Sequence, residues 1–406
     1  MHVPEAMKKA DRYDCLYVSY DGLLEPLGLS QVIPYLKGLS KNGIRIIALS
    51  FEKCSCLKWK TNIRYKDEEL SGFGIKWIRL RYHKHPSLLA TGFDVLVGLV
   101  VSLFLTQKYG IKILHARSYV AGLIGLFLCK IRRAKFLFDM RGFWVDERVE
   151  AGLWSKKCIT YRLARYFERG LLQGSNVNIV LTEAARKELM KSEKASIRCP
   201  YITVIPTCVD LSHFKSSARG VKYDFVCLGS VSTWCMPYEI VNFFRYATSV
   251  MPDTNFLILT KESEFFRRIL RNTKLNASRI SIVSASYEEV PDYLAHCKAG
   301  LAFYRSGYSR KGCCPTKVGE YLACGLPVII NSGVGDSEMI ISGERVGVII
   351  EDFSKSEYCR AFSEICKMLG EEEALRRRCR LTAEKYFSLE EGTKKYLTVY
   401  QGLIKK

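Results

Sequence analysis

Short, mainly apolar runs alternate with longer segments of helical periodicity along almost the whole chain. In the first half, seven such runs are predicted to be strands, at 15–20, 45–51, 75–80, 112–117, 135–140, 177–182 and 202–206. Several are continuously apolar, which is typical of strands covered on both faces. Between them, apolar residues recur at helical spacing, and Gly43 ends one such segment. This repetition predicts a parallel, doubly wound α/β sheet.

The same pattern restarts in the second half. Six further strands are predicted at 223–230, 255–260, 280–285, 299–304, 327–332 and 346–350, and the polar stretch 206–221 separates the two sets. We therefore expect two Rossmann-like domains, 1–206 and 222–383, whose strands point their carboxyl ends at a central cleft. The tail, 384–406, is predicted to be a closing helix that packs back toward the first domain.

One segment, 87–106, is apolar enough to raise the question of a membrane. Its centre, between Asp94 and Thr106, is only eleven residues long, whereas a membrane-spanning helix needs about 20. The interpretation that we favour is a buried helix of an α/β domain. A helix that dips into a membrane surface and a spanning helix are the alternatives.

Composition and charge narrow the class of protein. The chain has 406 residues, of which 48% are hydrophobic and 25% charged, as in ordinary globular proteins, so disordered and collagen-like chains are excluded. The formal net charge is +21 and is uneven: residues 1–200 hold 34 Lys and Arg against 18 Asp and Glu, and the remainder holds 28 against 23. The first half should therefore attract anions such as phospholipid headgroups or phosphorylated substrates.

The cysteines indicate a reducing compartment. Sixteen are present without the spacing of a disulfide framework, and the first fifteen residues lack the apolar core of a secretory signal. We expect reduced thiols in a cytoplasmic protein. Two close pairs, Cys54 with Cys56 and Cys313 with Cys314, are candidate zinc ligands, but neither has the partner spacing of a zinc site, so no metal is expected.

The most informative stretch is 309–329, SRKGCCPTKVGEYLACGLPVI. Pro315 suits the first position of a helix that Gly325 ends. The free N–H groups of a helix N-terminus and nearby cations make a site for a diphosphate, and Glu320, one turn further on, can accept hydrogen bonds from two ribose hydroxyls. An ordinary capped helix with a solvated basic first turn is the alternative. The polar residues of the predicted diphosphate site are Arg310, Lys311, Thr316 and Lys317.

This stretch resembles the nucleotide-sugar-binding signature of GT-B-fold glycosyltransferases, in the large retaining group often called family 4. Three further stretches resemble the same group in the expected order: 20–39, 138–154 and 205–214, the last reading IPTCVDLSHF. The resemblance covers nearly the whole chain. It implies retaining transfer of a sugar from a nucleoside diphosphate sugar to a hydroxyl acceptor, without a cofactor and usually without a metal.

The resemblance also implies a division of labour and a setting. The second domain would bind the donor, and the first would bind the acceptor, a glycan or a lipid-linked intermediate of surface polysaccharide synthesis. The basic first half fits an acceptor bearing a lipid diphosphate, or an anionic membrane on whose inner face the protein is peripheral. No nucleic acid is expected, because no basic motif interleaved with aromatic residues is present.

Two departures from the group's pattern concern the donor site. The group commonly has two glutamates eight positions apart; Glu320 matches the second, but Gly312 stands at the first. The loop after the first strand of the second domain carries Gly229 and Ser230 but no basic residue. In the first domain, Gly22 and Gly28 belong to a loop that would approach the donor phosphates, because glycine permits close backbone approach.

The predicted catalytic residues follow strands of the first domain. Where relatives often have His-x-His, this chain has His115 and Arg117, and Arg117 is a candidate partner for the donor diphosphate or an acidic acceptor. His115 has a packed histidine as its alternative. Asp139 and Asp21 are both candidates to take the acceptor proton, and the alternative for Asp139 is an ion pair with Arg141.

Two other functions compete with the transferase. A nucleotide-sugar epimerase would use the same fold and donor without an acceptor, and the loop at 20–31 argues for the transferase instead. A binding protein for anionic lipid or polymer would explain the charge of the first half, and it would show steep salt dependence and no nucleotide binding.

Overall fold

A computed structural model describes residues 12–53, 57–85, 87–132, 134–191, 201–215, 220–229, 234–273 and 275–405. The chain divides into two compact units. The first contains the chain up to Ile205 and again from Glu390 onward, and the second is Pro206–Leu389. The chain therefore leaves the first unit once and returns to it with its last helix.

The first unit is built on a parallel sheet with the strand order β3-β2-β1-β4-β5-β6-β7. The order reverses between β1 and β4, which pair in parallel with Val18 opposite Ala116. All residues of β1 and β4 are buried, as expected for central strands covered on both faces. The strands are β1 (Cys15–Ser19), β2 (Ile46–Glu52), β3 (Lys76–Arg81), β4 (Ile113–Arg117), β5 (Lys135–Asp139), β6 (Val177–Val180) and β7 (Ile202–Val204).

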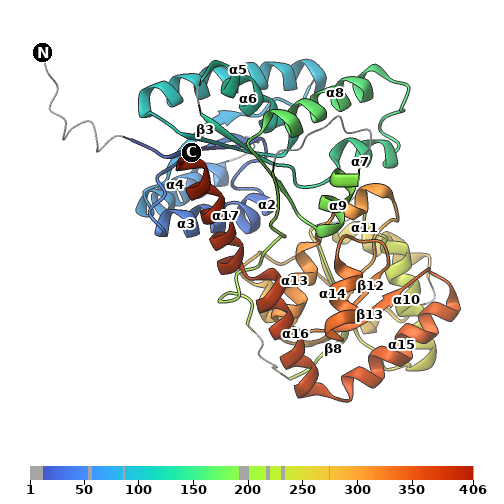
Figure 1. The fold of residues 1–406 in the computed structure, drawn as a ribbon. Coiled ribbons are helices and arrows are strands. Elements are labelled where there is room, and N and C mark those ends of the chain that lie inside the picture. Colours follow the sequence, from blue (N-terminus) through green and yellow to red (C-terminus); the bar gives the residue numbers. More distant parts are fainter. Residues whose placement is uncertain are drawn as a thin grey trace, which may run out of the picture. The chain divides into compact units, whose positions relative to one another are not determined.

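Helices cover both faces of this sheet. In Figure 1, α5, α6 and α8 lie together on one face, where α6 packs between the other two and against β4 and β5. The helices are α2 (Pro26–Gln31), α3 (Ile33–Lys41), α4 (Leu57–Gly72), α5 (Ser87–Tyr109), α6 (Ser118–Ile131), α7 (Trp144–Glu150), α8 (Ile159–Gly174), α9 (Glu183–Lys191) and α17 (Leu389–Ile404).

The second unit repeats the design with the strand order β10-β9-β8-β11-β12-β13, again all parallel. Its order reverses between β8 and β11, and the strand interiors are apolar, with Val226, Leu257 and Leu301 fully buried. The strands are β8 (Tyr223–Leu228), β9 (Phe256–Leu259), β10 (Ile280–Val283), β11 (Cys297–Ala302), β12 (Val328–Asn331) and β13 (Gly347–Ile350).

Two hydrophobic cores, one on each face of this second sheet, join it to its helices. The tight packing is visible at Gly300 in β11, where an added Cβ would lie 2.3 Å from the Tyr321 ring. The helices are α10 (Pro237–Val250), α11 (Ser263–Arg271), η1 (Ala277–Arg279), α12 (Val290–Leu294), η2 (Tyr308–Gly312), α13 (Thr316–Ala323), α14 (Ser337–Glu344), α15 (Lys355–Leu369) and α16 (Glu372–Phe387).

The structure confirms the predicted parallel α/β units, since each of the thirteen expected strands is present within a few residues of its expected range. The chain passes from the second unit back to the first between α16 and α17, a few residues beyond the 384 expected from the sequence. The prediction of a buried helix at 87–106 is wrong. That segment forms α5, which is long and apolar enough to cross a membrane, and only 28% of its most apolar window is buried.

Candidate functional site

The second unit has a candidate ligand-binding edge where its strand order reverses. Gly229 follows β8, and Tyr304 follows the neighbouring strand β11. Ligands of open α/β sheets bind beyond the carboxyl ends of the strands at this reversal, because the connections diverge there and leave a crevice. The isolated bridge between Cys235 and Tyr304 shows that the chain beyond β8 returns to this edge.

Helix α13 begins beside this edge with an N-terminus that no side chain caps. Pro315 is the N-cap residue, with φ −68° and ψ 120°, and Thr316 is the first helical residue, so the prediction of Pro315 at the first helical position is off by one. The first turn contains no acidic residue. Val318 N donates to the Pro315 carbonyl oxygen at 3.1 Å, so among the described residues the N–H groups of Thr316 and Lys317, with the positive end of the helix dipole, are available to an anion.

Lys317 in the first turn of α13 extends toward the end of β8. A Cβ added to Gly229 would lie 3.3 Å from Lys317 Nζ, and Nζ is 5.5 Å from the centre of the Tyr304 ring. Gly229 has φ +118°, a conformation that side chains rarely adopt, so the backbone there favours glycine. Among the described residues, no carboxylate forms an ion pair with Lys317. Its charge is thus available at the point where β8 ends.

Glu320 faces the same region from the next turn of α13. Its side chain is buried, and within the described part of the chain its carboxylate makes no hydrogen bond. Burial raises the pKa of Glu320 to about 7, and the nearby Lys317 charge only partly opposes this rise. A buried carboxyl without a partner is costly unless a ligand supplies hydrogen-bond donors, which is what a ribose would do.

Two aromatic residues near Glu320 were not predicted from the sequence. Burial, and after it the Glu320 charge, raises the pKa of Tyr287, which follows β10. Tyr287 stacks on the His213 ring with 5.0 Å between ring centres, and its carbonyl oxygen lies 3.2 Å from His213 Nε2. No sequence signal joins these positions, because they are 74 residues apart and only the fold of the second unit brings them together.

The remaining predicted donor residues differ in their placement. Arg310 is buried in η2, and its guanidinium stacks 4.0 Å from the centre of the Trp234 ring, so it is packed into the unit rather than exposed beside α13. Lys311 is half-buried, with Nζ 5.2 Å from the centre of the Tyr308 ring. Ser230 lies outside the described residues. The structure therefore brings together Gly229, Thr316, Lys317 and Glu320.

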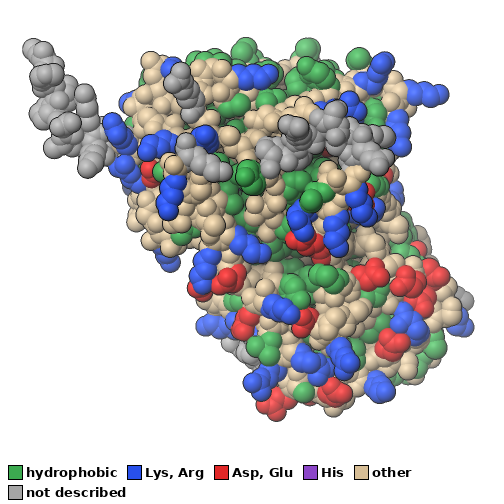
Figure 2. Space-filling model, in the orientation of Figure 1, with side chains coloured by type: hydrophobic (Ala, Val, Ile, Leu, Met, Phe, Trp, Pro, Cys, Tyr) green, Lys and Arg blue, Asp and Glu red, His purple; other side chains and the backbone are tan. Residues whose placement is uncertain are grey.

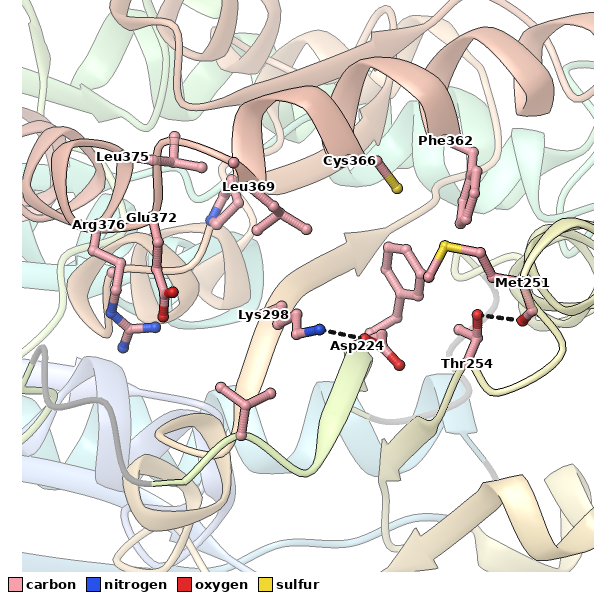
Figure 3. Close-up of a pocket in the computed structure, with 15 residues that line it drawn as sticks. Asp224, Met251, Thr254, Lys298, Phe362, Cys366, Leu369, Glu372, Leu375 and Arg376 are labelled. Atoms are coloured by element: carbon pink, nitrogen blue, oxygen red, sulfur yellow. Dashed lines mark hydrogen bonds and ion pairs between the residues drawn. The ribbon is translucent and has the colours of Figure 1, made fainter.

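The second unit also has a pocket of about 550 Å³, but it lies at the opposite edge of the sheet (Figure 3). Asp224 and Lys298, near the amino ends of β8 and β11, point toward each other across it and form an ion pair at 2.8 Å. Ligands of such sheets bind at the carboxyl ends. This pocket is therefore not the predicted donor site.

In the first unit, Glu52 holds the loop that carries Asp21 through a hydrogen bond. Glu52 was not predicted from the sequence as a site residue. The buried Glu52 accepts a hydrogen bond from Leu23 N at 2.8 Å through Oε1, and a Cβ on Gly22 would lie 2.6 Å from Glu52 Oε2. A Cβ on Gly28 would lie 2.4 Å from the carbonyl oxygen of Gly22. Packing against the backbone therefore requires glycine at position 28, whereas a side chain at Gly22 would displace the Glu52 carboxylate. Asp21 itself is half-exposed, and its carboxylate makes no hydrogen bond within the described residues.

His115 and Asp139 are held by the last helix. Tyr400 of α17 lies with its hydroxyl 2.8 Å from His115 Nδ1, and Tyr396 donates a hydrogen bond of 3.0 Å to Asp139 Oδ2. The distance from His115 Nε2 to Asp139 Oδ2 is 3.7 Å. His115 and Asp139 are 2% and 1% exposed, so both are structural contacts of α17 in this conformation.

Two arginines share the charge of Asp139. The NH1 atoms of Arg117 and Arg141 lie 4.0 and 3.8 Å from Asp139 Oδ2. Burial alone would raise the pKa of Asp139, but the Arg141 charge, the His115 ring and the Arg117 charge outweigh it and lower that pKa to about 2. Burial is also the main reason that the pKa of His115 is lowered. The ion pair of Asp139 with Arg141, which the sequence left as an alternative, is present.

The cluster of Asp139, Arg117 and Arg141 has more positive than negative charge, and the backbone next to it is strained. Ser118 and Arg141, which follow β4 and β5, have φ of 68° and 62°. Arg117 is buried, and within the described residues its guanidinium makes no hydrogen bond; its Nε atom is buried without a partner. Strained backbone and unpartnered buried donors concentrate at ligand sites. Arg117 is thus suited to bind an anion.

Among the described residues, no group of three or more His, Cys, Asp or Glu side chains could hold a metal ion. Cys313 and Cys314 form no disulfide within the described part of the chain, and the pair Cys54 and Cys56 lies outside it.

Solved structures similar to this chain indicate its fold type. No protein-family model matches the sequence, and no curated protein matches it. Among solved structures, sucrose-phosphate synthase from Thermosynechococcus elongatus is similar with a TM-score of 0.73 at 14% identity, covering 97% of this chain and 99% of that one. A glycosyltransferase from Rickettsia africae has a TM-score of 0.70 at 16% identity, covering 98% and 100%.

A third similar structure contains a nucleotide sugar. Anabaena HepE, solved in complex with UDP-glucose, has a TM-score of 0.67 at 13% identity and covers 96% of this chain and 99% of its own. These similarities extend over both units and agree with the two parallel sheets described above. The chain therefore has the two-domain, Rossmann-like fold of the GT-B glycosyltransferases.

Proposed function

We propose that the chain is a glycosyltransferase that moves a sugar from a nucleoside diphosphate sugar to a hydroxyl acceptor, with retention of configuration. One observation carries the proposal: the uncapped N-terminus of α13, with Lys317 and Glu320 on its first two turns, stands where the strand order of the second unit reverses. The fold supports it, since the similar HepE structures hold UDP and UDP-glucose.

The donor assignment follows from the charges at that edge. The free N–H groups of α13 and the Lys317 ammonium would bind the diphosphate, and Glu320 would accept hydrogen bonds from the ribose hydroxyls. As the bond from the sugar to the diphosphate breaks, negative charge accumulates on the leaving oxygen. Fixed donors at a helix N-terminus stabilise that charge without reorganising, which is how such a site lowers the barrier.

On the acceptor side, the structure favours Asp21 over Asp139 as the group that interacts with the attacking hydroxyl. Asp139 has its pKa lowered to about 2 and is committed to two arginines and Tyr396, so it is a poor proton acceptor. Asp21 is half-exposed and follows β1, at the reversal point of the first sheet. The positive charge of Arg117 and Arg141 supports an acidic acceptor, such as a lipid-linked intermediate of surface polysaccharide synthesis in the cytoplasm.

A thermal-shift panel tests the donor. UDP, GDP, ADP and their sugars are added to the purified protein, and a ligand that binds only the native state raises the midpoint by mass action. We expect one nucleotide series to stabilise the protein. Titration calorimetry of that donor should then give an affinity about tenfold weaker or more for Lys317→Ala, because the lost contact is charge-assisted. Lys367→Ala, an exposed lysine of α15 in the same unit, is the matched control.

NMR then follows the nucleotide sugar that stabilised the protein, incubated with the protein in the presence and in the absence of a lipid or glycan fraction. Transfer requires the acceptor, whereas conversion of the donor sugar without one would show an epimerase instead. If no nucleotide stabilises the protein, or if Lys317→Ala and Lys367→Ala bind the donor equally, the proposed donor site is wrong.

A further inference from the structure

The outward face of α5 is apolar along its whole length. Five large apolar side chains point to solvent at intervals of three or four residues, so that they form one stripe down the helix. They are Leu89, Phe93, Leu96, Val100 and Phe104, each more than half exposed. Contiguous apolar patches of this extent are uncommon on soluble monomers and mark sites of interaction.

The inner face of the same helix is fixed to the first unit. Asp94, the only charged residue between Ser87 and Gln107, is 1% exposed; it accepts hydrogen bonds from the Tyr20 hydroxyl at 2.9 Å and from His83 N at 3.0 Å. At Gly98 an added Cβ would lie 2.5 Å from the Ile124 side chain of α6. A membrane-spanning role would require α5 to leave these contacts, so α5 is a surface helix with one apolar side.

A second helix of the same layer presents a related face. Along α8 the outward positions alternate between apolar and basic, and the only acidic residue of this helix, Glu168, is buried. The exposed apolar and basic residues of α8 are Ile159, Arg162, Leu163, Tyr166 and Arg169, and Lys156 and Lys157 precede them. Helix α6 joins α5 to α8, and it ends with exposed Lys130 and Ile131.

We propose that this layer, the outward faces of α5 and α8, docks on an anionic lipid bilayer. The apolar stripe of α5 enters the interfacial region, and the basic residues of α8 contact the headgroups, as in interfacial helices. Figure 2 shows hydrophobic and basic side chains along the edge of the first unit where Figure 1 places α5 and α8. Charge decides against a second copy of the chain, because two copies of this face would bring basic residues together without an acidic partner on α5 or α8.

Vesicle flotation tests the docking. Vesicles of equal parts phosphatidylglycerol and phosphatidylcholine are mixed with the full chain, and the floated fraction is compared with that for pure phosphatidylcholine. We expect binding that is weaker on the neutral vesicles and falls as salt is raised. The double variant Phe93→Gln with Phe104→Gln should lower the partition coefficient about tenfold or more, because two large apolar side chains no longer enter the lipid.

The matched control is Met339→Gln with Leu381→Gln, which makes the same kind of change at exposed positions of the second unit. Equal thermal midpoints for all proteins exclude misfolding as the cause. Equal flotation of the two double variants would overturn the proposal. A second result would also overturn it: the wild-type chain does not bind anionic vesicles, and light scattering shows a dimer that the replacement of Phe93 and Phe104 converts to a monomer. Vesicle binding needs no turnover, so this test is independent of the proposed transferase activity.

Discussion

Asp139→Asn removes one negative charge from a buried cluster of the first unit that also holds Arg117 and Arg141. In the native protein the carboxylate lies 4.0 and 3.8 Å from the two guanidiniums and accepts the Tyr396 hydrogen bond. The variant leaves two positive charges in a buried place without a counterion. Removing one partner of a buried ion pair is strongly destabilising for this reason.

The magnitude follows from the pKa of Asp139. Its shift from the ordinary 3.8 to about 2 corresponds to about 2–3 kcal/mol of preferential stabilisation of the charged form. With the uncompensated arginines, we expect a loss of about 2–4 kcal/mol in the free energy of unfolding. Because the folded pKa lies below the unfolded value, this stabilisation is complete above pH 4 or so and is lost as the pH falls toward about 2.

Urea unfolding followed by circular dichroism measures the loss. The control is Asp67→Asn, which removes the 3.1 Å ion pair with Arg79 at the surface of the same unit. Exposed pairs of that kind contribute about 0–1 kcal/mol. The reasoning would be refuted if both variants shifted the urea midpoint equally at neutral pH, or if the Asp139→Asn deficit persisted unchanged at pH 2 or so, where the native carboxylate is half protonated.

Three further outcomes are expected. Glu320→Gln should weaken donor binding about tenfold in calorimetry, since a neutral amide accepts weaker hydrogen bonds from a ribose; unchanged affinity would remove Glu320 from the site. Because its pKa is raised from 4.5 to about 7, Glu320 lowers the native protein's stability as pH rises through that window, and thermal melts of Glu320→Gln should lack this component. Gly28→Ala should cost about 1–3 kcal/mol in urea, because its Cβ meets the Gly22 carbonyl oxygen at 2.4 Å. Gly402→Ala, at an exposed helical position with open space around it, should instead stabilise by up to about 1 kcal/mol, and similar effects at both glycines would contradict the packing argument.

The order of strands and helices could be predicted from the sequence because the apolar and polar positions of each element reflect which of its faces are buried. Central strands such as β1 and β9 are apolar at nearly every position, and burial on both faces explains such a run. Gly229, Lys317 and Glu320 were also found in the sequence, since a turn, a helix start and one helical turn are set by neighbouring residues. Local sequence was therefore enough to indicate the candidate donor edge.

Contacts between distant segments needed the tertiary structure. Tyr396 and Tyr400 lie more than 250 residues beyond Asp139 and His115, and no periodicity could pair them. The contact of Glu52 with the Asp21 loop and the proximity of Tyr287 to Glu320 likewise could not be predicted from local sequence. The solvent-facing side of α5 is a similar case, because an apolar run looks the same whether protein covers it or not.

The sequence by itself determined which segments fold into strands and helices, and it placed the start of α13 to within one residue, because those properties depend on neighbours along the chain. The tertiary structure decided that Asp139 forms ion pairs with two arginines and that the Arg310 guanidinium packs on the Trp234 ring. It also decided that the outward face of α5 is exposed to solvent. Each of these depends on which surfaces meet in three dimensions, and burial then sets the charge, the pKa and the accessibility of the side chain.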